Sequence, residues 1–399
     1  MRWLLFFAEP LTRCSAVCNE DLPINTLNRI KILVVCGTRP DTIKMAPVVI
    51  ELKRHSDRVD LALAVTGQHR EMLEQVLYTF ELTPDYDLNI MSARQTLAQI
   101  TTRALEGLDQ VIQEVKPNLI LAQGDTTTTF VASLAAFYNR IPFGHVEAGL
   151  RTDNKFDPFP EEINRRLTSV LCDLHFPPTE LARRSLLDEG VREEDIFVTG
   201  NTVIDALLSI AARNYEFEDD RIKHALTYEK MILMTAHRRE NWGEPMANIC
   251  AAVKDIVTRH PEVSLVFPVH KNPIVRDVVF PALSGLDRVV LIEPPDYVPF
   301  VHLMKASYMI LTDSGGVQEE APSLGKPVLA LRRTTERPEG IEAGSAKLVG
   351  TDTDIIISET ERLLDNKAAY DKMARVNNPY GDGKAAERIW EAIRSRFLP

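Results

Sequence analysis

Cysteine is scarce in this sequence, and the few cysteines present are not arranged in pairs. Only five of the 399 residues are cysteines, an odd number without any CxxC spacing (Cys14, Cys18, Cys36, Cys172 and Cys250). Disulfide-stapled domains and structural zinc sites need dense or closely paired cysteines. We therefore expect reduced thiols, no metal site and a cytoplasmic protein.

Long apolar runs and an excess of basic residues are also lacking. A membrane-spanning helix needs roughly 18 consecutive apolar residues, and no stretch reaches that length. The apolar run "WLLFF" is broken by Glu9 and Pro10 with no small-residue cleavage site after it, so we interpret residues 1–29 as an N-terminal extension. The net charge is −11, whereas proteins that bind nucleic acid need clustered Lys and Arg. Membrane and nucleic-acid partners are therefore not expected.

Several signatures of common enzyme classes are missing. The sequence has no GxGxxG after a strand, no GxxxxGK[ST], no HExxH, no DxD-type metal motif and no GxSxG. These absences argue against dinucleotide-dependent dehydrogenases, P-loop enzymes, zinc proteases and α/β-hydrolases. We expect no cofactor.

From residue 30 onward, apolar strands alternate with helices. The first four strands read "IKILVVCG", "DLALAVTG", "PNLILAQG" and "IPFGHVEAG", and five more run from "YEKMILMTAH" to "KPVLAL". Continuously apolar strands indicate parallel sheets that helices cover on both faces. We predict two Rossmann-like doubly wound α/β domains facing each other across a cleft, residues 30–199 and 200–383. We also expect the C-terminal helix, 384–399, to complete the first domain.

Polar and glycine-rich segments follow these strands immediately. In open parallel sheets, ligands bind beyond the carboxyl ends of the strands. Seven such strand ends are expected to meet at one site, which indicates a ligand (Gly37–Pro40, Gly67–Arg70, Gly124–Thr126, His145–Glu147, His237–Glu240, His270–Pro273 and Asp313–Gly316).

The stretch "DSGGVQEEAPSLGKP", residues 313–327, is the clearest of these segments. It follows the strand "YMILT" and precedes a short helix from Val317, so Ser314, Gly315 and Gly316 lie where helical N–H groups have no partners. Glycines let the backbone approach a phosphate closely, and the helix dipole favours negative charge there. A tight turn without a ligand is the alternative for this stretch alone.

Three carboxylates are candidates for acid and base chemistry, namely Asp125, Glu147 and Glu161. Each also has a structural interpretation. Asp125 could cap a helix, Glu147 could pair with Arg151, and Glu161 could complement a helix dipole.

Both predicted domains contribute basic side chains that could neutralise a diphosphate (Arg39, Lys44, His237 and Arg337). A surface salt bridge is the alternative for each of the four. For His237, a packed or helix-capping role is a further alternative.

The chain closely resembles the non-hydrolysing UDP-N-acetylglucosamine 2-epimerases, which have the two-domain GT-B architecture. The resemblance runs from about residue 30 to the C-terminus and depends on long blocks in a fixed order, such as "GTRPDTIKMAPVV", "GDTTTTFVASLAAFY", "HVEAGLRT", "PFPEEINRRLTS", "VTGNTVIDAL", "TAHRREN", "LTDSGGVQEEAPSLGKPVL", "RTTERPEG" and "NPYGDGKAAERI".

The resemblance implies an interconversion of UDP-GlcNAc and UDP-ManNAc. Such enzymes eliminate UDP to give bound 2-acetamidoglucal, then add UDP back with a proton on the other face of carbon 2. This route needs no nicotinamide, in agreement with the missing dinucleotide fingerprint. The products would serve surface polysaccharide synthesis.

The resemblance also implies roles for individual residues. Asp125, Glu147, Glu161 and His237 match the catalytic positions, with Asp125 and Glu147 as the preferred acid/base pair. Further positions match the substrate site (Arg39, Lys44, Phe300, Ser314, Gly315, Gly316, Glu320 and Arg337). Four more match a second UDP-GlcNAc site that acts allosterically in bacterial members (Gln68, Arg94, Arg238 and His270). Members are usually homodimers.

The same motifs are compatible with other activities. A hydrolysing epimerase would release UDP and free ManNAc. An epimerase acting on another UDP-2-acetamido sugar would keep the same motifs. A GT-B glycosyltransferase would need an acceptor, and a non-catalytic UDP-sugar-binding protein would not need the carboxylates.

Overall fold

A computed structural model describes residues 28–67, 70–92, 94–152 and 154–399. The first sheet has six parallel strands in the order β3-β2-β1-β4-β5-β6. Its strands and helices are β1 (Ile30–Cys36), α1 (Arg39–Arg54), β2 (Val59–Val65), α2 (Arg70–Thr79), β3 (Tyr86–Asp87), α3 (Leu97–Val115), β4 (Leu119–Gln123), α4 (Thr127–Tyr138), β5 (Phe143–Val146), α5 (Glu161–Leu171), β6 (Leu174–Phe176) and α6 (Glu180–Asp188).

The second sheet repeats this order as β12-β11-β10-β7-β8-β9, with every pairing parallel. The remaining strands and α-helices are α7 (Thr202–Ala211), α8 (Asp220–Ala225), β7 (Lys230–Thr235), α9 (Glu244–Arg259), β8 (Val263–Pro268), α10 (Pro273–Leu283), β9 (Val289–Ile292), α11 (Tyr297–Ala306), β10 (Met309–Thr312), α12 (Gly315–Glu320), β11 (Val328–Ala330), α13 (Pro338–Ala343), β12 (Ala346–Leu348), α14 (Thr353–Asp365), α15 (Lys367–Ala374) and α16 (Ala385–Phe397).

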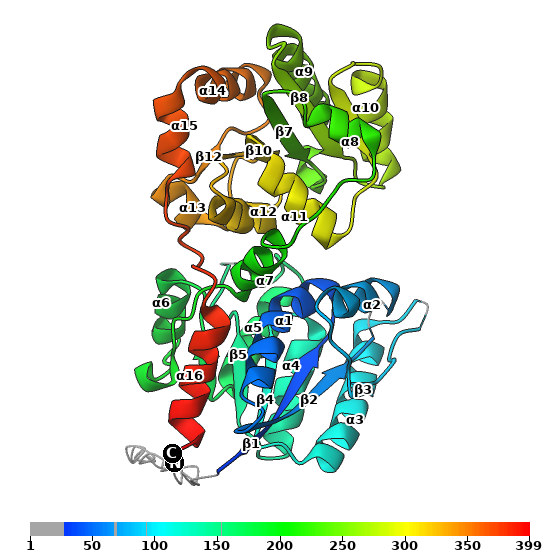
Figure 1. The fold of residues 1–399 in the computed structure, drawn as a ribbon. Helices are drawn as coiled ribbons and strands as arrows, with labels where there is room; N and C mark the ends of the chain where they lie inside the picture. The colour runs from blue at the N-terminus through cyan, green and yellow to red at the C-terminus, as the bar shows by residue number, and fades with distance from the viewer. Residues whose placement is uncertain (1–27, 68–69, 93, 153) are drawn as a thin grey trace, which may run out of the picture.

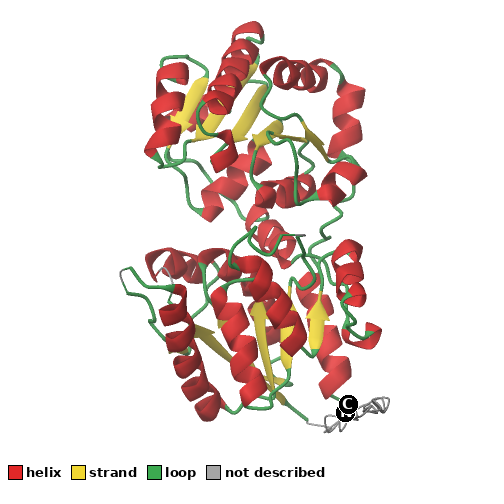
Figure 2. Cartoon of the chain, turned by 180° about the vertical axis from the view of Figure 1, so that it is seen from behind, coloured by secondary structure: helices red, strands yellow, loops and turns green. Residues whose placement is uncertain are grey.

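The predicted fold class is confirmed. Helices cover both faces of each sheet, and the two domains stand one above the other (Figures 1 and 2). The strands are apolar throughout, as in β4, where all five residues are buried, because both faces pack against helices. The strands β3, β6 and β12 were not predicted. They have only two or three residues, too few for a periodic pattern.

Local sequence explains the start of α1, the helix that carries two candidate residues. Thr38 is its N-cap in extended conformation, and Asp41 accepts the Thr38 N–H at 3.1 Å in a capping box. Pro40 occupies the first turn, where a missing N–H costs nothing. These residues start α1 directly after the carboxyl end of β1, so Arg39 and Lys44 lie in its first two turns, beside that end of the sheet.

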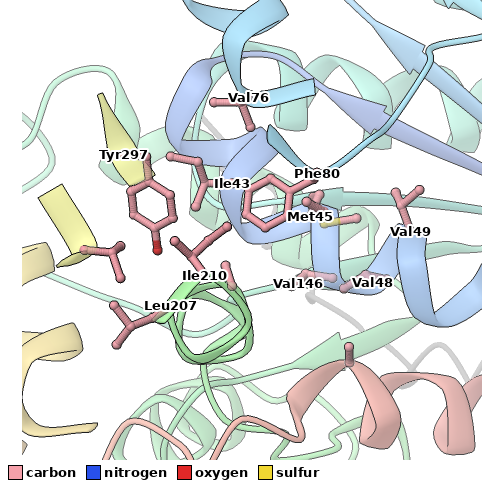
Figure 3. Close-up of a cluster of buried hydrophobic side chains, with 14 of the residues drawn as sticks. Ile43, Met45, Val48, Val49, Val76, Phe80, Val146, Leu207, Ile210 and Tyr297 are labelled. Atoms are coloured by element: carbon pink, nitrogen blue, oxygen red, sulfur yellow. The ribbon is translucent and has the colours of Figure 1, made fainter. Parts of the chain in front are cut away.

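Helix α7 joins the two domains. It packs against α1 and α16 on one side and against α11 and α12 on the other. One apolar cluster continues across this junction, and in Figure 3 Ile43 of α1, Ile210 of α7 and Tyr297 of α11 lie side by side. Helix α16 also packs along α1, beside the first sheet (Figure 1). We propose the domain boundary at residues 199/200, with α16 counted in the first domain.

The N-terminal extension, for the most part residues 1–27, lies outside the described residues. Within the part of the chain that the structure covers, no helix is both long and apolar enough to cross a membrane.

Candidate active site

Both sheets reverse their strand order at one point, and the candidate residues follow the strands at those points. In the first sheet the reversal lies between β1 and β4, and in the second between β7 and β10. A crevice at such a switch point is where open α/β sheets bind ligands. Lys44, Asp125, His237 and Ser314 follow these four strands.

Glu147 is held in a special backbone conformation directly after β5. Its φ is 64°, a left-handed value that side-chain-bearing residues adopt rarely and often at functional sites. Its side chain is nearly buried and accepts three donors. Lys44 Nζ lies 2.5 Å from Oε1, Asn201 Nδ2 lies 3.1 Å from the same oxygen, and Gln123 donates to Oε2.

These contacts keep Glu147 ionised. Burial alone pushes its pKa upward, but the charge and hydrogen bond of Lys44, together with Arg337 and Asn201, outweigh burial and hold the pKa below its usual value. For Lys44, burial lowers the pKa, while Glu147 and Glu319 raise it above the usual lysine value. The predicted alternative of a Glu147–Arg151 pair is wrong, because Arg151 pairs with Glu189 at 2.6 Å.

Asp125 follows β4, the strand that pairs with β5, so the carboxyls of Asp125 and Glu147 leave adjacent strands and interact electrostatically. Its Oδ2 accepts Arg165 Nη2 at 2.7 Å, and its backbone carbonyl accepts Asn164 Nδ2 at 2.9 Å, both from α5. Burial raises the pKa of Asp125, with Glu147 adding to the effect and Arg165 opposing it. The helix-cap alternative is wrong, since Thr126 caps α4. The neighbouring carboxyls therefore have pKa values shifted in opposite directions.

Glu161 is the first residue of α5 and is half-buried. It precedes Arg165 by four residues and therefore shares the helix face that contacts Asp125. Both Glu161 and Glu162 stand in the first turn, where negative charge complements the helix dipole. Glu162 is fully buried and serves the local structure, accepting Arg166 Nε at 2.6 Å and the Thr152 N–H at 3.0 Å.

In the second domain, Asp313 fixes His237. The Asp313 carboxylate is completely buried and lies 3.0 Å from His237 Nδ1, while its other oxygen accepts the backbone N–H groups of His237 and Arg238, each at 2.9 Å. The His237 side chain is 43% exposed, so it is not a packed core histidine. Its Nδ1 is oriented by Asp313, which leaves the opposite edge of the ring for a ligand.

The opening of α12 has the geometry expected of an anion site. Ser314 is the N-cap residue, and its hydroxyl makes no capping bond to the helix. Gly315, Gly316 and Val317 occupy the first turn, where backbone N–H groups have no partner inside the helix. The helix begins two residues earlier than predicted, so both glycines belong to it.

Glu320, at the end of α12, is buried and accepts the Tyr297 hydroxyl at 3.2 Å. Burial, and then the charge of Glu319, raise the pKa of Glu320 to about 8. A neutral or readily protonated carboxyl at this place can both donate and accept hydrogen bonds.

Arg337 pairs with Glu319, a residue for which the sequence analysis predicts no role. The charges of Glu319 and Glu147 raise the pKa of Arg337 against the effect of burial. Asn201 Nδ2 also contacts Glu319 at 3.3 Å. Lys44, Glu147, Asn201, Glu319 and Arg337 therefore form one polar network that joins the domains.

The other predicted substrate residues lie in the same region. Arg39 is half-buried at the start of α1 and makes no ion pair with another residue of the described ranges. Phe300 is half-buried in α11, one turn after Tyr297.

Two of the four predicted allosteric residues adjoin this site. The His270 ring stacks on His237 with centroids 5.9 Å apart, and a Cβ added at Gly315 would lie 3.7 Å from Arg238 Nη2. Arg238 itself pairs with Glu336 at 3.1 Å. Arg94 is exposed on the first domain with φ of 59°. Gln68 lies outside the described residues.

Four residues of the site were missed by sequence reasoning, namely Gln123, Arg165, Asn201 and Glu319. Asn201 and Glu319 stand in the quoted blocks "VTGNTVIDAL" and "DSGGVQEEAPSLGKP", where a polar residue beside an apolar run is a usable signal. Gln123 ends the apolar run "LILAQ" and could have been found in the same way.

Comparison with known proteins agrees with this geometry. Residues 50–394 match the family model described as UDP-N-acetylglucosamine 2-epimerase. A UDP-N-acetylglucosamine 2-epimerase of Yersinia pestis is 54% identical over 371 residues, covering 92% of this chain and 98% of the relative. One of Bacillus subtilis is 53% identical over 367 residues, covering 92% and 96%.

A solved structure shares both fold and sequence. The UDP-GlcNAc 2-epimerase of Neisseria meningitidis bound to UDP-GlcNAc is 50% identical with a TM-score of 0.81, covering 92% of this chain and 100% of that one. By sequence and by fold, the chain belongs to the UDP-N-acetylglucosamine 2-epimerase family.

Proposed function

We propose that this protein interconverts UDP-N-acetylglucosamine and UDP-N-acetylmannosamine without hydrolysing them. The observation that carries the proposal is the pair of neighbouring carboxyls, Asp125 and Glu147, whose pKa values are shifted in opposite directions. Inverting a carbon requires one group to take a proton from one face and another to return a proton to the opposite face. Two carboxyls in unlike environments can divide that task.

Elimination and re-addition of UDP would together invert carbon 2 of the sugar. A base removes the proton from carbon 2 as the bond from carbon 1 to the diphosphate oxygen breaks, which leaves a double bond between carbons 1 and 2. Re-addition forms the bond to UDP again and places a proton on the opposite face of carbon 2. Ionised Glu147 is the proposed proton acceptor in one direction, and Asp125 is the proposed donor. Their roles exchange in the reverse direction.

The departing diphosphate carries the charge that develops in the transition state, so it needs donors arranged in advance. Arg39, Lys44, His237 and Arg337 are the proposed cationic groups, with Ser314 and the first N–H groups of α12 completing the site. Lys44 and Arg337 are already paired with carboxylates. A bound diphosphate would compete for both cations and thereby make Glu147 a stronger base.

Nucleoside recognition is assigned to the second domain. Glu320 is proposed to bond the ribose hydroxyls, and Phe300 to contact the nucleotide. A relative from Methanocaldococcus jannaschii, 34% identical with a TM-score of 0.73, was solved in complex with UDP-GlcNAc and UDP, which supports a nucleotide-sugar site. Glu161 is proposed as a third catalytic carboxylate because it shares a helix face with Arg165.

Three further parts of the proposal concern regulation, assembly and context. A second UDP-GlcNAc bound by Gln68, Arg94, Arg238 and His270 would activate the enzyme. The supporting observation is the stack of His270 on His237. The proposed place of action is the cytoplasm, and the proposed role is the supply of surface polysaccharide precursors.

A homodimer is proposed from an exposed apolar face on α5. Ile163, Leu167 and Val170 recur at helical spacing and are 37%, 43% and 82% exposed. Such a stripe on one helix is suited to contact with a second copy of the chain.

The test is NMR of UDP-GlcNAc incubated with the protein in heavy water. Deuterium is expected at carbon 2 of both epimers as UDP-ManNAc forms. Free ManNAc with UDP would instead identify a hydrolysing epimerase. Absence of deuterium at carbon 2, with the sugar unchanged, would overturn the proposed function.

A further inference from the structure

Asn201 makes polar contacts with four separate parts of the chain. It is the N-cap of α7, where its Oδ1 accepts the Val203 N–H at 3.0 Å. Its own backbone N–H donates to the Tyr380 carbonyl at 2.7 Å, where the chain crosses back to the first domain. Its Nδ2 contacts Glu147 Oε1 at 3.1 Å and Glu319 Oε2 at 3.3 Å. The residue is 2% exposed.

Only an amide side chain can make these contacts together. The cap needs an acceptor, and the two carboxylates need two N–H donors. A hydroxyl has one hydrogen, and a carboxylate has none. Capping alone would be served equally by Ser, Thr or Asp. The carboxylates of Glu147 and Glu319 are therefore the reason that this position needs an asparagine.

The two carboxylates belong to different domains. Glu147 follows β5 of the first sheet, whereas Glu319 lies in α12 of the second. The other donors to Glu147, Lys44 and Gln123, belong to the first domain and move with it. Asn201 stands where the chain passes between the domains, and α7 behind it packs on both.

We propose that Asn201 is a positioning residue that orients the Glu147 carboxylate and ties this orientation to the placement of the second domain through Glu319. The inference rests on the proposed function, because it assumes that Glu147 exchanges a proton with carbon 2. A change in the angle between the domains would shift Asn201 relative to Glu147. Asn201 would therefore hold the Glu147 carboxylate in the orientation needed for proton transfer in one arrangement of the domains.

Asn201→Ser separates this role from capping. Serine keeps a cap acceptor but donates to neither carboxylate as the amide does. Losing a hydrogen bond to a charged group is expected to lower kcat by about 10- to 100-fold. The KM for UDP-GlcNAc is expected to change much less. Because Asn201 helps to keep Glu147 ionised, the acidic limb of the pH–rate profile is expected to move to higher pH.

Asn201→Asp is the second variant and also preserves the cap. It places a third carboxylate against Glu147 and Glu319, so a larger loss of kcat is expected. Asn366→Ser is the matched control, because Asn366 caps α15 by accepting the Ala369 N–H at 3.0 Å and contacts neither carboxylate. It should retain the kcat and the pH profile of the unmodified protein.

The outcomes are distinguishable. A wild-type kcat and pH profile in Asn201→Ser, with Glu147→Gln inactive, would overturn the role of Asn201 and leave the proposed function intact. A loss of kcat matched by an equal loss of folded protein in both variants, with the acidic limb unmoved, would assign Asn201 to capping and also overturn the proposal. Carbon 2 exchange that survives in Glu147→Gln would overturn the role of Asn201 together with the assignment of Glu147 as a proton carrier, whereas absence of exchange in the unmodified protein would overturn the proposed function.

Discussion

Lys44 Nζ lies 2.5 Å from Glu147 Oε1, and both side chains are largely withdrawn from solvent. The pair joins a helix at the end of the first strand to the residue after the fifth. Breaking a buried ion pair from one side is far more costly than removing both partners, because the remaining charge has no compensation.

Lys44→Met is therefore expected to lower the free energy of unfolding by about 3–5 kcal/mol. The double variant Lys44→Met/Glu147→Gln should recover a large part of that loss. Urea denaturation of the ligand-free protein measures both. Lys367→Met is the control, since its partner Asp371 lies on the surface and an exposed pair contributes less than about 1 kcal/mol. Equal losses in the single and double variants would contradict the prediction.

Asp125→Asn and Glu147→Gln are each expected to slow deuterium exchange at carbon 2 by about 10²- to 10⁴-fold, because each removes one proton carrier. NMR in heavy water measures the rate. Glu361→Gln, which alters a half-buried carboxylate of α14 paired with Arg259, should exchange at the wild-type rate. If both active-site variants exchanged normally, neither carboxyl would be the acid or the base.

The raised pKa of Glu320 predicts how the stability of the protein depends on pH. Its pKa rises from the ordinary 4.5 to about 8 on folding, so between these values the native state holds a proton that the unfolded state has lost. Stability from this group is therefore complete below pH 4.5 and declines as the pH rises toward 8, by at most about 1.4 kcal/mol per pH unit. Thermal unfolding of ligand-free Glu320→Gln between these pH values should show a smaller decline than the unmodified protein. Parallel curves would contradict the prediction.

Gly316→Ala is expected to weaken nucleotide binding while leaving the stability of the fold nearly unchanged. An added Cβ would lie 3.7 Å from Glu320 Oε1 and 3.9 Å from Ser314 Oγ, which are ordinary contacts, so the melting temperature should stay nearly unchanged. The methyl group would stand on the exposed surface of the first helical turn, where we place the diphosphate. Calorimetric titration should show UDP binding weakened by about tenfold or more, as for the loss of one charge-assisted hydrogen bond. Unweakened binding would place the diphosphate elsewhere.

Val170→Glu tests the proposed dimer. A charge at Val170, the most exposed residue of the apolar stripe on α5, is expected to prevent association, and sedimentation velocity should then show a monomer. Ile355→Glu, at a 47% exposed position on α14, should sediment like the unmodified protein. A dimer that persists in Val170→Glu would exclude this face as the interface.

Strand and helix patterns allowed much of the fold to be predicted, since apolar runs such as "LILAQ" need burial on both faces wherever they occur. The same reasoning failed for β3, whose two residues, Tyr86 and Asp87, carry no periodicity and pair with β2 only because the neighbouring strand is already there. The sequence also did not allow us to predict which charged side chains pair with each other. Arg151 stands four residues after Glu147, yet it pairs with Glu189, 38 positions away.

The order of apolar and polar residues by itself determined that two parallel sheets would form and that Asp125, Glu147 and Ser314 would follow strands, because these are local consequences of periodicity and turn chemistry. Only the tertiary structure decided which charges meet. Lys44, Asn201 and Glu319 come from a helix, an interdomain crossing and the opposite domain, and their contacts with each other or with Glu147 depend on how the two sheets are packed. Burial of that network and the charges that it brings together, neither of which a local pattern reports, shift the pKa values on which the proposed chemistry depends.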